Sequence, residues 1–578
     1  MIRRKEVHSG AEHSRMHRVL GVRDLTLFGI AAILGAGSFS SLGGAIFHGG
    51  PGVVWLFVIV AVACGFTALC YSEFASRIPV AGSAYTYAYA SFGEIFAWII
   101  GWALLMEYSI GNIYVAFSWS DYFTSLTDRM GWHIPPHFCT SYAEAHKAIL
   151  EGSTNKELTD AWNLAPRLGS LRIILDMPAI AINVFITWLV LRGIKESRNF
   201  SNAMVVLKMV VVLLVILVGG YLVFANDLTG NWFPANAAGE SRFMPNGFEG
   251  VMFAVSGVFF AYIGFDAVSV LAEESKNPQR DLPRGMIYSL VICTAVYILL
   301  SLVLSGAVHY AKFDGIGDPL AFIFEKDNLN VGWMQFLVAI CAVIAMSSVL
   351  LVFQMGQPRI WMSMSRDGLL PAKFQEIHPR YKTPGFSTLL TGLVVGVPLL
   401  FTDKTFVLDF TSIGTLFAFV LVCGGVLLIP NRSKTKGSFH LPYINGMYIF
   451  PLIMLSTVLI VGAFYPEYFT GIMQWNLSAD EMRAAGSPEQ IADKLTSLRT
   501  YNFSTLLFWL VCIVLCIQGF RKQWSLIPLL GLVTCLYLLT GMTANNWLWF
   551  FIWFGIGLGV YFVYGIRHSK LRHGEEGT

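Results

Sequence analysis

The stretch AAILGAGSFSSLGGAIF, residues 31–47, decides the fold of this chain. Its two ends are apolar, like a helix that crosses a membrane, but its middle holds four glycines and three serines. Each glycine destabilises a helix by about 1 kcal/mol relative to alanine, so the backbone can leave its own hydrogen-bond ladder here. Backbone groups released inside a bilayer must find partners in the protein or line a watery cavity. The stretch therefore predicts either a broken helix that holds a small polar solute or close helix packing through small residues.

A second interrupted apolar stretch favours the broken helix. Residues 257–266 read GVFFAYIGFD, with a glycine and an aspartate inside an otherwise apolar run. This stretch begins the second half of a possible duplication. Interrupted hydrophobic segments at matching places in two halves of a chain are the best sequence pointer to a transporter binding site.

The composition is that of a membrane protein. Of the 578 residues, 55% are hydrophobic and 13% are charged, whereas soluble domains carry roughly 25% charged residues. Apolar stretches long enough to cross about 30 Å of hydrocarbon recur along the whole chain. The net charge of +3 gives no indication of a nucleic-acid partner.

We expect about fourteen membrane spans, each close to the length that a bilayer requires. They are placed at residues 25–47, 51–72, 93–126, 172–191, 202–225, 248–272, 287–308, 331–355, 386–401, 407–429, 449–465, 504–519, 525–541 and 546–564.

The charge pattern orients these spans. Residues 1–24 form a basic N-terminal tail without the apolar core and cleavage site of a signal peptide. If this tail is cytoplasmic, most of the 39 Lys and Arg residues fall in cytoplasmic loops, as the positive-inside rule requires. The C-terminal tail, residues 565–578, is then also cytoplasmic. Two long segments, 129–170 and 466–503, lie on the outer side, and their helix-favouring stretches predict short capping helices within 139–170 and 477–500.

Metal, cofactor and disulfide chemistry are not indicated. The nine cysteines show no paired Cys-x-x-Cys spacing, and Cys139 alone falls in an outer segment. The twelve histidines show no helical His pair beside a carboxylate. We therefore predict no metal site and no cofactor, and the chain shows no nucleophile–base pattern of an enzyme.

Lys208 lies in the apolar segment SNAMVVLKMVVVLLVILVGG. An ammonium inside a span is costly and is by default a functional hypothesis. Desolvation lets such a lysine exchange a proton near neutral pH, and its charge can occupy the place of a sodium ion beside a broken helix. The alternative is a lysine that snorkels to the interface, since the polar start of its helix is close.

Two acidic residues lie within spans. Glu107 is inside the third span, and Asp266 follows the second interruption. Each could pair with a basic group, carry a proton or attract a cationic side chain. Each could equally form a structural hydrogen bond to a neighbouring helix.

The two helix breaks suit a zwitterion. Freed N–H groups at the start of a half-helix can bind a carboxylate, helped by the positive end of the helix dipole. Freed carbonyl groups can bind an ammonium. Because an α-amino acid carries both groups on adjacent atoms, we favour an amino acid over a sugar or an inorganic ion.

Five long motifs carry a family resemblance: ALCYSEFASRIPVAGSAYTYAY (68–89), FFAYIGFDAV (259–268), AEESKNPQRDLPRG (272–285), PRIWMSMSRDGLLP (358–371) and IGTLFAFVLVCGGVL (413–427). With these motifs the chain resembles permeases of the amino acid–polyamine–organocation superfamily, and most closely the cationic amino acid transporter branch. The resemblance covers residues 20–565.

The resemblance implies an all-α membrane fold with the inverted five-plus-five repeat of the sodium–leucine transporter (LeuT-like) fold. The repeats would be residues 25–225 and 248–430, followed by four additional spans in 449–564. The implied substrate site is formed by the first, third, sixth and eighth spans. The matching site positions are Gly35, Ala36, Gly37 and Ser38 for the carboxylate, Phe260, Ala261 and Ile263 for the amine, Ser347 and Ser348 for the side chain, Lys208 for proton coupling, and Glu107 and Asp266 as acidic pocket or gate residues.

One position departs from the family pattern. The family usually reads Gly-x-Gly-Ile-Phe at the first break, whereas this chain has Ser38 in place of the isoleucine, followed by Ser40 and Ser41. The extra hydroxyls could change selectivity or hold water near the carboxylate. They could also form hydrogen bonds between helices.

These observations predict a proton-coupled amino acid symporter of the plasma membrane, with cationic or small neutral L-amino acids as substrates and alternating access as its mechanism. Protons, the substrate and the lipid bilayer are the expected partners, and no obligatory protein partner is evident. An exchanger or an uncoupled facilitator on the same scaffold remains an alternative, as does a non-transporting amino acid sensor.

Overall fold

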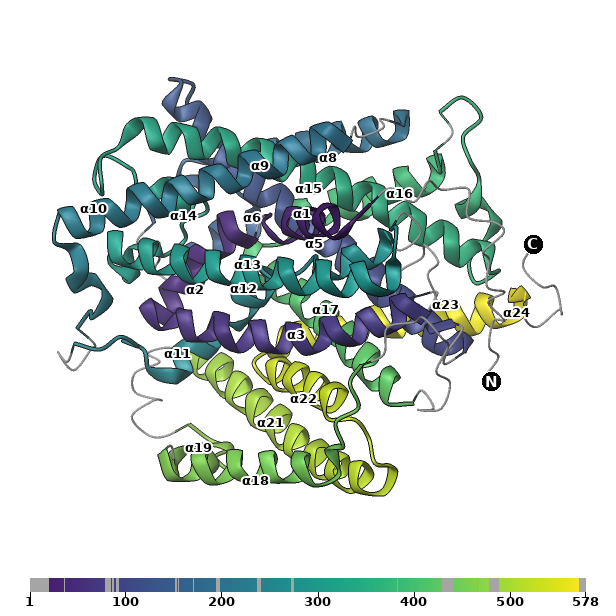
Figure 1. Cartoon of the computed structure of the whole chain (residues 1–578). Helices are drawn as coiled ribbons and strands as arrows, with labels where there is room; N and C mark the ends of the chain where they lie inside the picture. Colours follow the sequence, from purple (N-terminus) through teal and green to yellow (C-terminus); the bar gives the residue numbers. More distant parts are fainter. Residues whose placement is uncertain are drawn as a thin grey trace.

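The computed structural model describes residues 20–35, 37–77, 85, 88–89, 93–150, 153, 155–169, 171–193, 198–235, 241–271, 275–381, 383–428, 441–464, 466–477 and 488–570. In these ranges the chain folds into a bundle of helices, most of which run roughly side by side (Figure 1). Extended structure in the described ranges is limited to a two-residue hairpin, β1 (Arg167–Leu168) and β2 (Leu171–Arg172), which pair antiparallel.

The first part of the chain supplies the helices that surround the first break. They are α1 (Val22–Ile33), the π-helical turn η1 (Gly37–Ser41), α2 (Leu42–Gly49), η2 (Gly50–Gly52), α3 (Val53–Arg77), α5 (Glu94–Arg129), η3 (Pro136–Phe138), α6 (Tyr142–Leu150), α7 (Lys156–Asn163), α8 (Met177–Arg192), α9 (Arg198–Leu214), η4 (Val215–Gly219), α10 (Gly220–Ala225) and η5 (Leu228–Trp232).

The second part supplies the second break and the helices that pack beside it. They are α11 (Gly247–Phe253), α12 (Val255–Phe260), η6 (Phe265–Leu271), α13 (Pro278–Ala307), η7 (Tyr310–Phe313), α14 (Pro319–Phe322), α15 (Gly332–Arg366), η8 (Ala372–Gln375), α16 (Gly385–Gly396), η9 (Pro398–Leu400) and α17 (Lys404–Leu428).

The last part of the chain begins with helices along one side of the bundle (Figure 1) and ends with a long helix that packs against α5 and α17. It contains α18 (Gly446–Phe464), α19 (Pro466–Ile472), α21 (Pro488–Lys522), α22 (Leu526–Thr540), α23 (Ala544–Val560), η10 (Tyr561–Gly565) and α24 (Ile566–His568).

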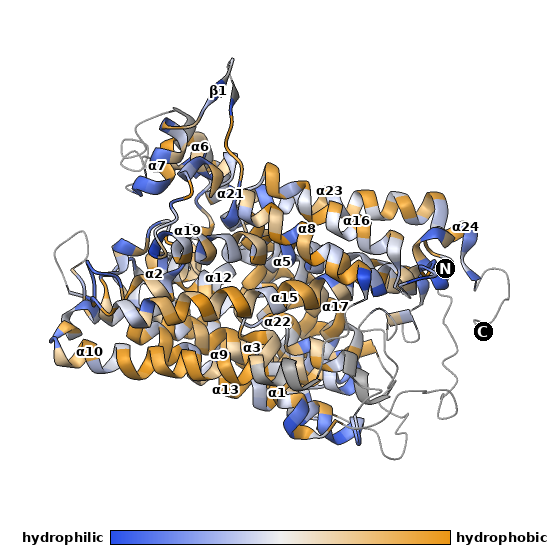
Figure 2. Ribbon diagram, turned by 90° about the horizontal axis from the view of Figure 1, so that it is seen from above, coloured by the Kyte–Doolittle hydropathy of each residue, from blue (hydrophilic) through white to orange (hydrophobic). Residues whose placement is uncertain are grey.

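Nine helices in the described part of the chain are long and apolar enough to cross a membrane, and four shorter apolar helices accompany them. Hydrophobic residues run along the lengths of the helices, and hydrophilic residues gather toward their ends (Figure 2). This distribution is the one that a bilayer imposes, because a helix satisfies its backbone groups internally and exposes only its side chains to lipid.

The core is formed by α5, which packs against α15 and α17, and by α13, which packs against α1 and α3. Small residues bring these helices close together. Gly101 on α5 lies against Met364 of α15, and Gly111 lies against the ring of Phe353. The 36-residue helix α5 is therefore a central part of the core, and the broken helices lie beside it.

The outer segments differ in part from the sequence prediction. Short helices do occur within 139–170, where α6 and α7 form a small core of their own around Ala145 and Ala161. In the other segment, residues 488–500 are helical as predicted. They do not form a separate short helix, because they are the first turns of the continuous helix α21. No proline or glycine interrupts the chain between 489 and 518, so the polar start and the apolar span form one helix. Residues 478–487 lie outside the described ranges.

Candidate functional site

The first break separates α1 from α2. The helix α1 ends at Ile33, and Leu34 adopts a non-helical conformation with φ −77° and ψ 71°. The N–H of Gly35 then donates to the carbonyl of Ile33 over 2.8 Å, which turns the chain sharply. Helical structure resumes in the π-turn that begins at Gly37. Ala36 lies outside the described residues.

The second break follows α12, which ends at Phe260. Ala261 and Ile263 lie in the turn behind it, and both are buried. Gly264 has φ +111°, a conformation that residues with a side chain rarely adopt. A Cβ atom at Gly264 would lie 2.9 Å from the carbonyl of Ala32, so the turn also requires glycine to pack against α1.

The two breaks lie against each other, and a tyrosine connects them. The hydroxyl of Tyr297, on α13, lies 2.9 Å from the carbonyl oxygen of Ile33 and 2.7 Å from that of Ala261. These carbonyls belong to the two helix ends released by the breaks. A hydroxyl has one proton to donate, so the two carbonyls share it. The carbonyl of Ile33 also accepts from the N–H of Gly35, whereas that of Ala261 retains acceptor capacity for a further donor.

The three serines of the first break form hydrogen bonds to backbone. Ser38 donates to the carbonyl of Gly35 over 2.9 Å, and Ser40 donates to that of Gly317 over 2.8 Å. Ser41 lies within 2.8 Å of the carbonyl of Gly257 on α12. Of the two roles that the sequence left open, the structure supports hydrogen bonding within and between helices.

Lys208 is buried, with 3% of its surface exposed. It lies on α9, which packs against α1 and α15. A lysine that snorkels would expose its ammonium at the bundle surface, so the burial supports a role inside the protein. The side chain has an interaction partner in the structure.

Glu107 and Asp266 lie within electrostatic range of each other, although they come from α5 and η6. Thr415 on α17 lies close to Glu107, while Glu107 Oε2 is buried without a hydrogen-bond partner among the described residues. Tyr71 faces both acids, and its buried hydroxyl likewise has no partner in the described part of the chain. The structure thus brings these two predicted residues together in a polar cluster beside the second break.

Ser347 and Ser348 lie on α15 and are half-buried. Ser347 accepts a hydrogen bond of 2.9 Å from the indole of Trp119 on α5. Ser348 donates to the carbonyl of Ala345 over 2.7 Å. The contact of Ser347 joins α15 to α5, and that of Ser348 lies within α15; the contact with a substrate side chain stays a prediction.

A cavity of about 970 Å³ lies beside the helices that carry the two breaks. Its lining includes Ser40 and Ser41 from the first break and Gly257 from α12. Tyr114 of α5 also lines it and packs edge-on against Phe260, with ring centroids 4.5 Å apart. We call this cavity the vestibule, because it leads from the end of the bundle that carries α6 and α7 to the breaks.

The vestibule also contains an ion pair that was not predicted from the sequence. Lys404, the first residue of α17, pairs with Asp121 of α5. Asp121 is a carboxylate inside the predicted span 93–126, and an ionisable residue within a span is a functional signal by default. That signal was present in the sequence. The pairing itself was not, because the two residues are 283 positions apart.

Apolar helices of spanning length, two of which break at a shared point beside a polar cavity, define a polytopic membrane protein of the transporter class. The chain belongs to the amino acid permease family: the family's sequence profile matches residues 20–479, and the profile of the amino acid permease C-terminus matches residues 526–569.

Individual relatives agree with this assignment. The chain is 38% identical to the branched-chain amino acid permease BcaP of Bacillus subtilis over 77% of its own length and 89% of the relative. It is 36% identical to the methylthioribose transporter of the same organism, with the same coverage of both chains. It is 30% identical to the human cationic amino acid transporter 4 over 98% of its length and 90% of the relative. The family and these relatives are transporters, which is consistent with a protein that is not an enzyme.

Proposed function

We propose that this protein is a proton-coupled amino acid symporter that works by alternating access. The observation that carries the proposal is the contact between the two helix breaks, where Tyr297 touches a carbonyl from each. A site built from backbone groups of both breaks changes shape when the breaks move relative to each other. A substrate bound there shifts the conformational equilibrium by its differential affinity for the two states.

The backbone at the first break binds the substrate carboxylate in this proposal, at Gly35, Ala36, Gly37 and Ser38. The carbonyls of Phe260, Ala261 and Ile263 at the second break bind the ammonium. Tyr297 supports the ammonium subsite, because it shares its one proton with Ile33 and leaves acceptor capacity on the carbonyl of Ala261. Ser347 and Ser348 then face the substrate side chain.

Lys208 is the proton-coupling residue of the proposal. Its burial on a helix that packs against α1 supports this role, since a change in its protonation alters the charge next to the first break. Glu107 and Asp266 form the acidic part of the pocket or gate.

The proposal includes the topology that the sequence indicates. The repeats are residues 25–225 and 248–430 with inverted orientation, and both termini lie in the cytoplasm of a cell whose plasma membrane holds the protein. The vestibule then faces outward. Each break occurs in the first span of its repeat, as expected if the two halves arose by duplication.

Uptake of radiolabelled arginine, alanine and leucine into proteoliposomes, with and without an inward proton gradient, tests the proposal. We expect concentrative uptake of at least one of them that depends on the gradient. Lys208→Ala should lose concentrative uptake and keep exchange. Lys208→Arg keeps the positive charge but cannot release its proton, so it should lose concentrative uptake as well.

Uptake that is indifferent to the gradient in all three proteins would replace symport by exchange or facilitated diffusion. If the wild-type protein binds and moves none of the three amino acids, the proposal of amino acid transport fails.

A further inference from the structure

The ion pair between Lys404 and Asp121 lies in the wall of the vestibule. The side chains of Lys404 and Asp121 are 13% and 28% exposed. The ammonium of Lys404 lies 5.6 Å from the ring centroid of Tyr114, and that ring packs on Phe260 of the second break. One aromatic ring therefore separates the lysine charge from the proposed substrate site.

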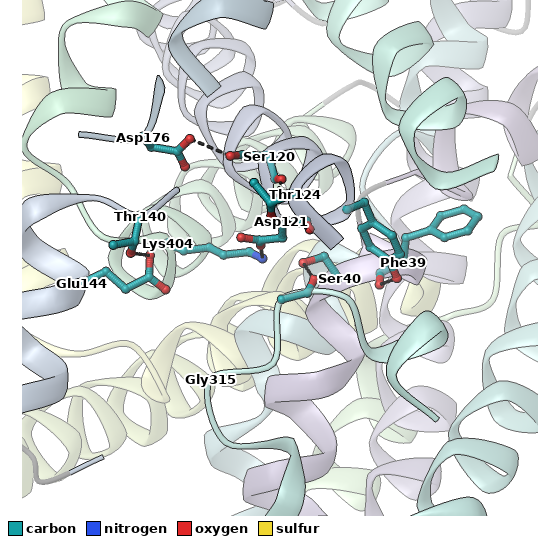
Figure 3. A network of polar contacts seen from close by, with 12 residues as sticks. Phe39, Ser40, Ser120, Asp121, Thr124, Thr140, Glu144, Asp176, Gly315 and Lys404 are labelled. Atoms are coloured by element: carbon teal, nitrogen blue, oxygen red, sulfur yellow. Dashed lines mark hydrogen bonds and ion pairs between the residues drawn. The ribbon is translucent and has the colours of Figure 1, made fainter. Parts of the chain in front are cut away.

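The neighbouring backbone fixes the position of Asp121. A Cβ atom at Gly317 would lie 2.3 Å from Asp121 Oδ2, so the carboxylate packs directly on a glycine that leaves room for it. Ser40 of the first break donates to the carbonyl of the same Gly317. Figure 3 shows Lys404 reaching toward Asp121, with Glu144 on one side and Ser40 on the other. The ion pair is thus anchored both to α5 and to the first break.

The vestibule around this pair is acidic. Nine Asp or Glu side chains line it, against three Lys or Arg side chains. Such a cavity raises the local concentration of cations. Of its three basic residues, Lys404 is the one paired with Asp121, whereas Lys147 lies on α6 in the wall formed by the outer segment.

We propose that Lys404 determines specificity for the charge of the substrate side chain. The Lys404 ammonium is paired with Asp121, so a cationic substrate side chain must displace it on the way to the breaks. A neutral amino acid passes without competing for Asp121. The inference rests on the proposed amino acid transport. The competition follows from Coulomb's law, since two ammonium or guanidinium groups cannot share one carboxylate without repulsion.

The test compares KM for arginine and leucine uptake in proteoliposomes that contain wild-type protein, Lys404→Met or Lys147→Met. Lys404→Met should lower KM for arginine about twofold to fivefold, the effect of a partly exposed charge pair, and leave KM for leucine unchanged. Lys147→Met removes the same charge from the same cavity and should change the arginine-to-leucine ratio much less. The gain should shrink at high salt.

Asp121 provides the reverse test. Asp121→Asn removes the carboxylate and leaves the lysine charge in place, so KM for arginine should rise relative to that for leucine. In Lys404→Met/Asp121→Asn the arginine gain of the single lysine variant should disappear, since the two changes act on one interaction. Lys404→Arg, which preserves the charge, should keep the wild-type ratio.

Equal changes in KM for arginine and leucine in Lys404→Met would overturn the inference, as would the same selectivity change in Lys147→Met. If Lys404→Met is not recovered as folded protein, the Asp121→Asn result decides: an unchanged arginine-to-leucine ratio rejects the inference. Failure of the proposed function gives a different result, namely wild-type protein that moves neither amino acid.

Discussion

Gly37 packs directly on Ala261: a Cβ atom added to Gly37 would lie 2.5 Å from the Cα of Ala261. Gly37 begins the π-turn after the first break, and Ala261 is the first residue after α12. The two breaks are thus in backbone contact at these residues. No side-chain rearrangement can relieve a clash with a Cα atom, so this distance sets how closely the two broken helices approach.

Gly37→Ala should therefore separate the breaks and abolish amino acid uptake. We also expect a lower melting temperature of the purified protein, because an overpacked contact typically costs about 1–3 kcal/mol. Proteoliposome uptake and thermal unfolding in detergent are the measurements.

Gly44→Ala is the matched control for this variant. Gly44 lies on α2, seven residues further along, and a Cβ atom there meets nothing within 4 Å. The control should keep uptake and be equally or slightly more stable, since alanine favours helix over glycine. Full uptake in Gly37→Ala would show that the two breaks are not the transport site.

Tyr297→Phe removes the hydroxyl that lies between the carbonyls of Ile33 and Ala261. Leaving buried carbonyls without this donor costs about 1–3 kcal/mol, and the geometry of the proposed ammonium site relaxes. We expect KM for the transported amino acid to rise about tenfold or more.

The control for Tyr297→Phe is Tyr85→Phe, another buried tyrosine, whose hydroxyl donates to Asp367 and touches neither break. It should destabilise the protein without a comparable change in KM. Equal kinetic effects of the two variants would contradict a special role for Tyr297.

Glu144, on α6 beside the vestibule, should make stability depend on pH. Burial, followed by the nearby charge of Asp121, raises the pKa of Glu144 from 4.5 to about 7. The folded protein therefore holds this proton more tightly than the unfolded chain does. Its stabilising contribution is complete below pH 4.5 and is lost as the pH rises toward 7.

Glu144→Gln should remove this loss, so its melting temperature should exceed that of the wild-type protein at pH 8 and approach it at pH 4.5. Thermal unfolding in detergent across this range is the measurement. Parallel curves for the two proteins would argue against an elevated pKa of Glu144.

Asp176 joins α8 to α5. Its carboxylate accepts hydrogen bonds from the backbone N–H of Ala179, at the start of α8, and from the hydroxyl of Ser120 on α5. Asp176→Ala should lower the free energy of unfolding by about 1–2 kcal/mol through loss of the helix cap, measured as a lower melting temperature.

Asn155→Ala removes the corresponding cap of α7, an eight-residue helix in the outer segment. Because α7 packs outside the main core, this variant should have a smaller effect on unfolding of the bundle. An equal drop in melting temperature in both variants would show that the cap of α8 stabilises only its own helix and not the bundle.

Several features could be read from single stretches of the sequence. The apolar spans, the interruption around Gly35 and Gly37 and the second interruption near Gly264 are local properties, because glycine content and hydropathy act on the helix that carries them. The sequence left open whether Lys208 is buried or snorkels, and the structure decided for burial. Within 477–500 the described residues 488–500 are helical as expected, but they are not a separate helix, because no proline or glycine divides them from the span that follows.

Pairing across the bundle could not be read in this way. No local pattern indicates that Tyr297 touches both breaks, that Glu107 and Asp266 face each other, or that Lys404 pairs with Asp121. Each of these contacts joins helices that are far apart in the chain, and many rotations of an apolar helix satisfy the same hydropathy pattern.

The sequence by itself determined that this is a membrane-embedded helical protein with two broken helices, since lipid requires apolar surfaces and internally satisfied backbones. Only the tertiary structure decided which side chains meet at the breaks and in the vestibule. The physical reason is that helix rotation and register are set by packing between neighbours, through small residues such as Gly37 and Gly317 that allow close approach.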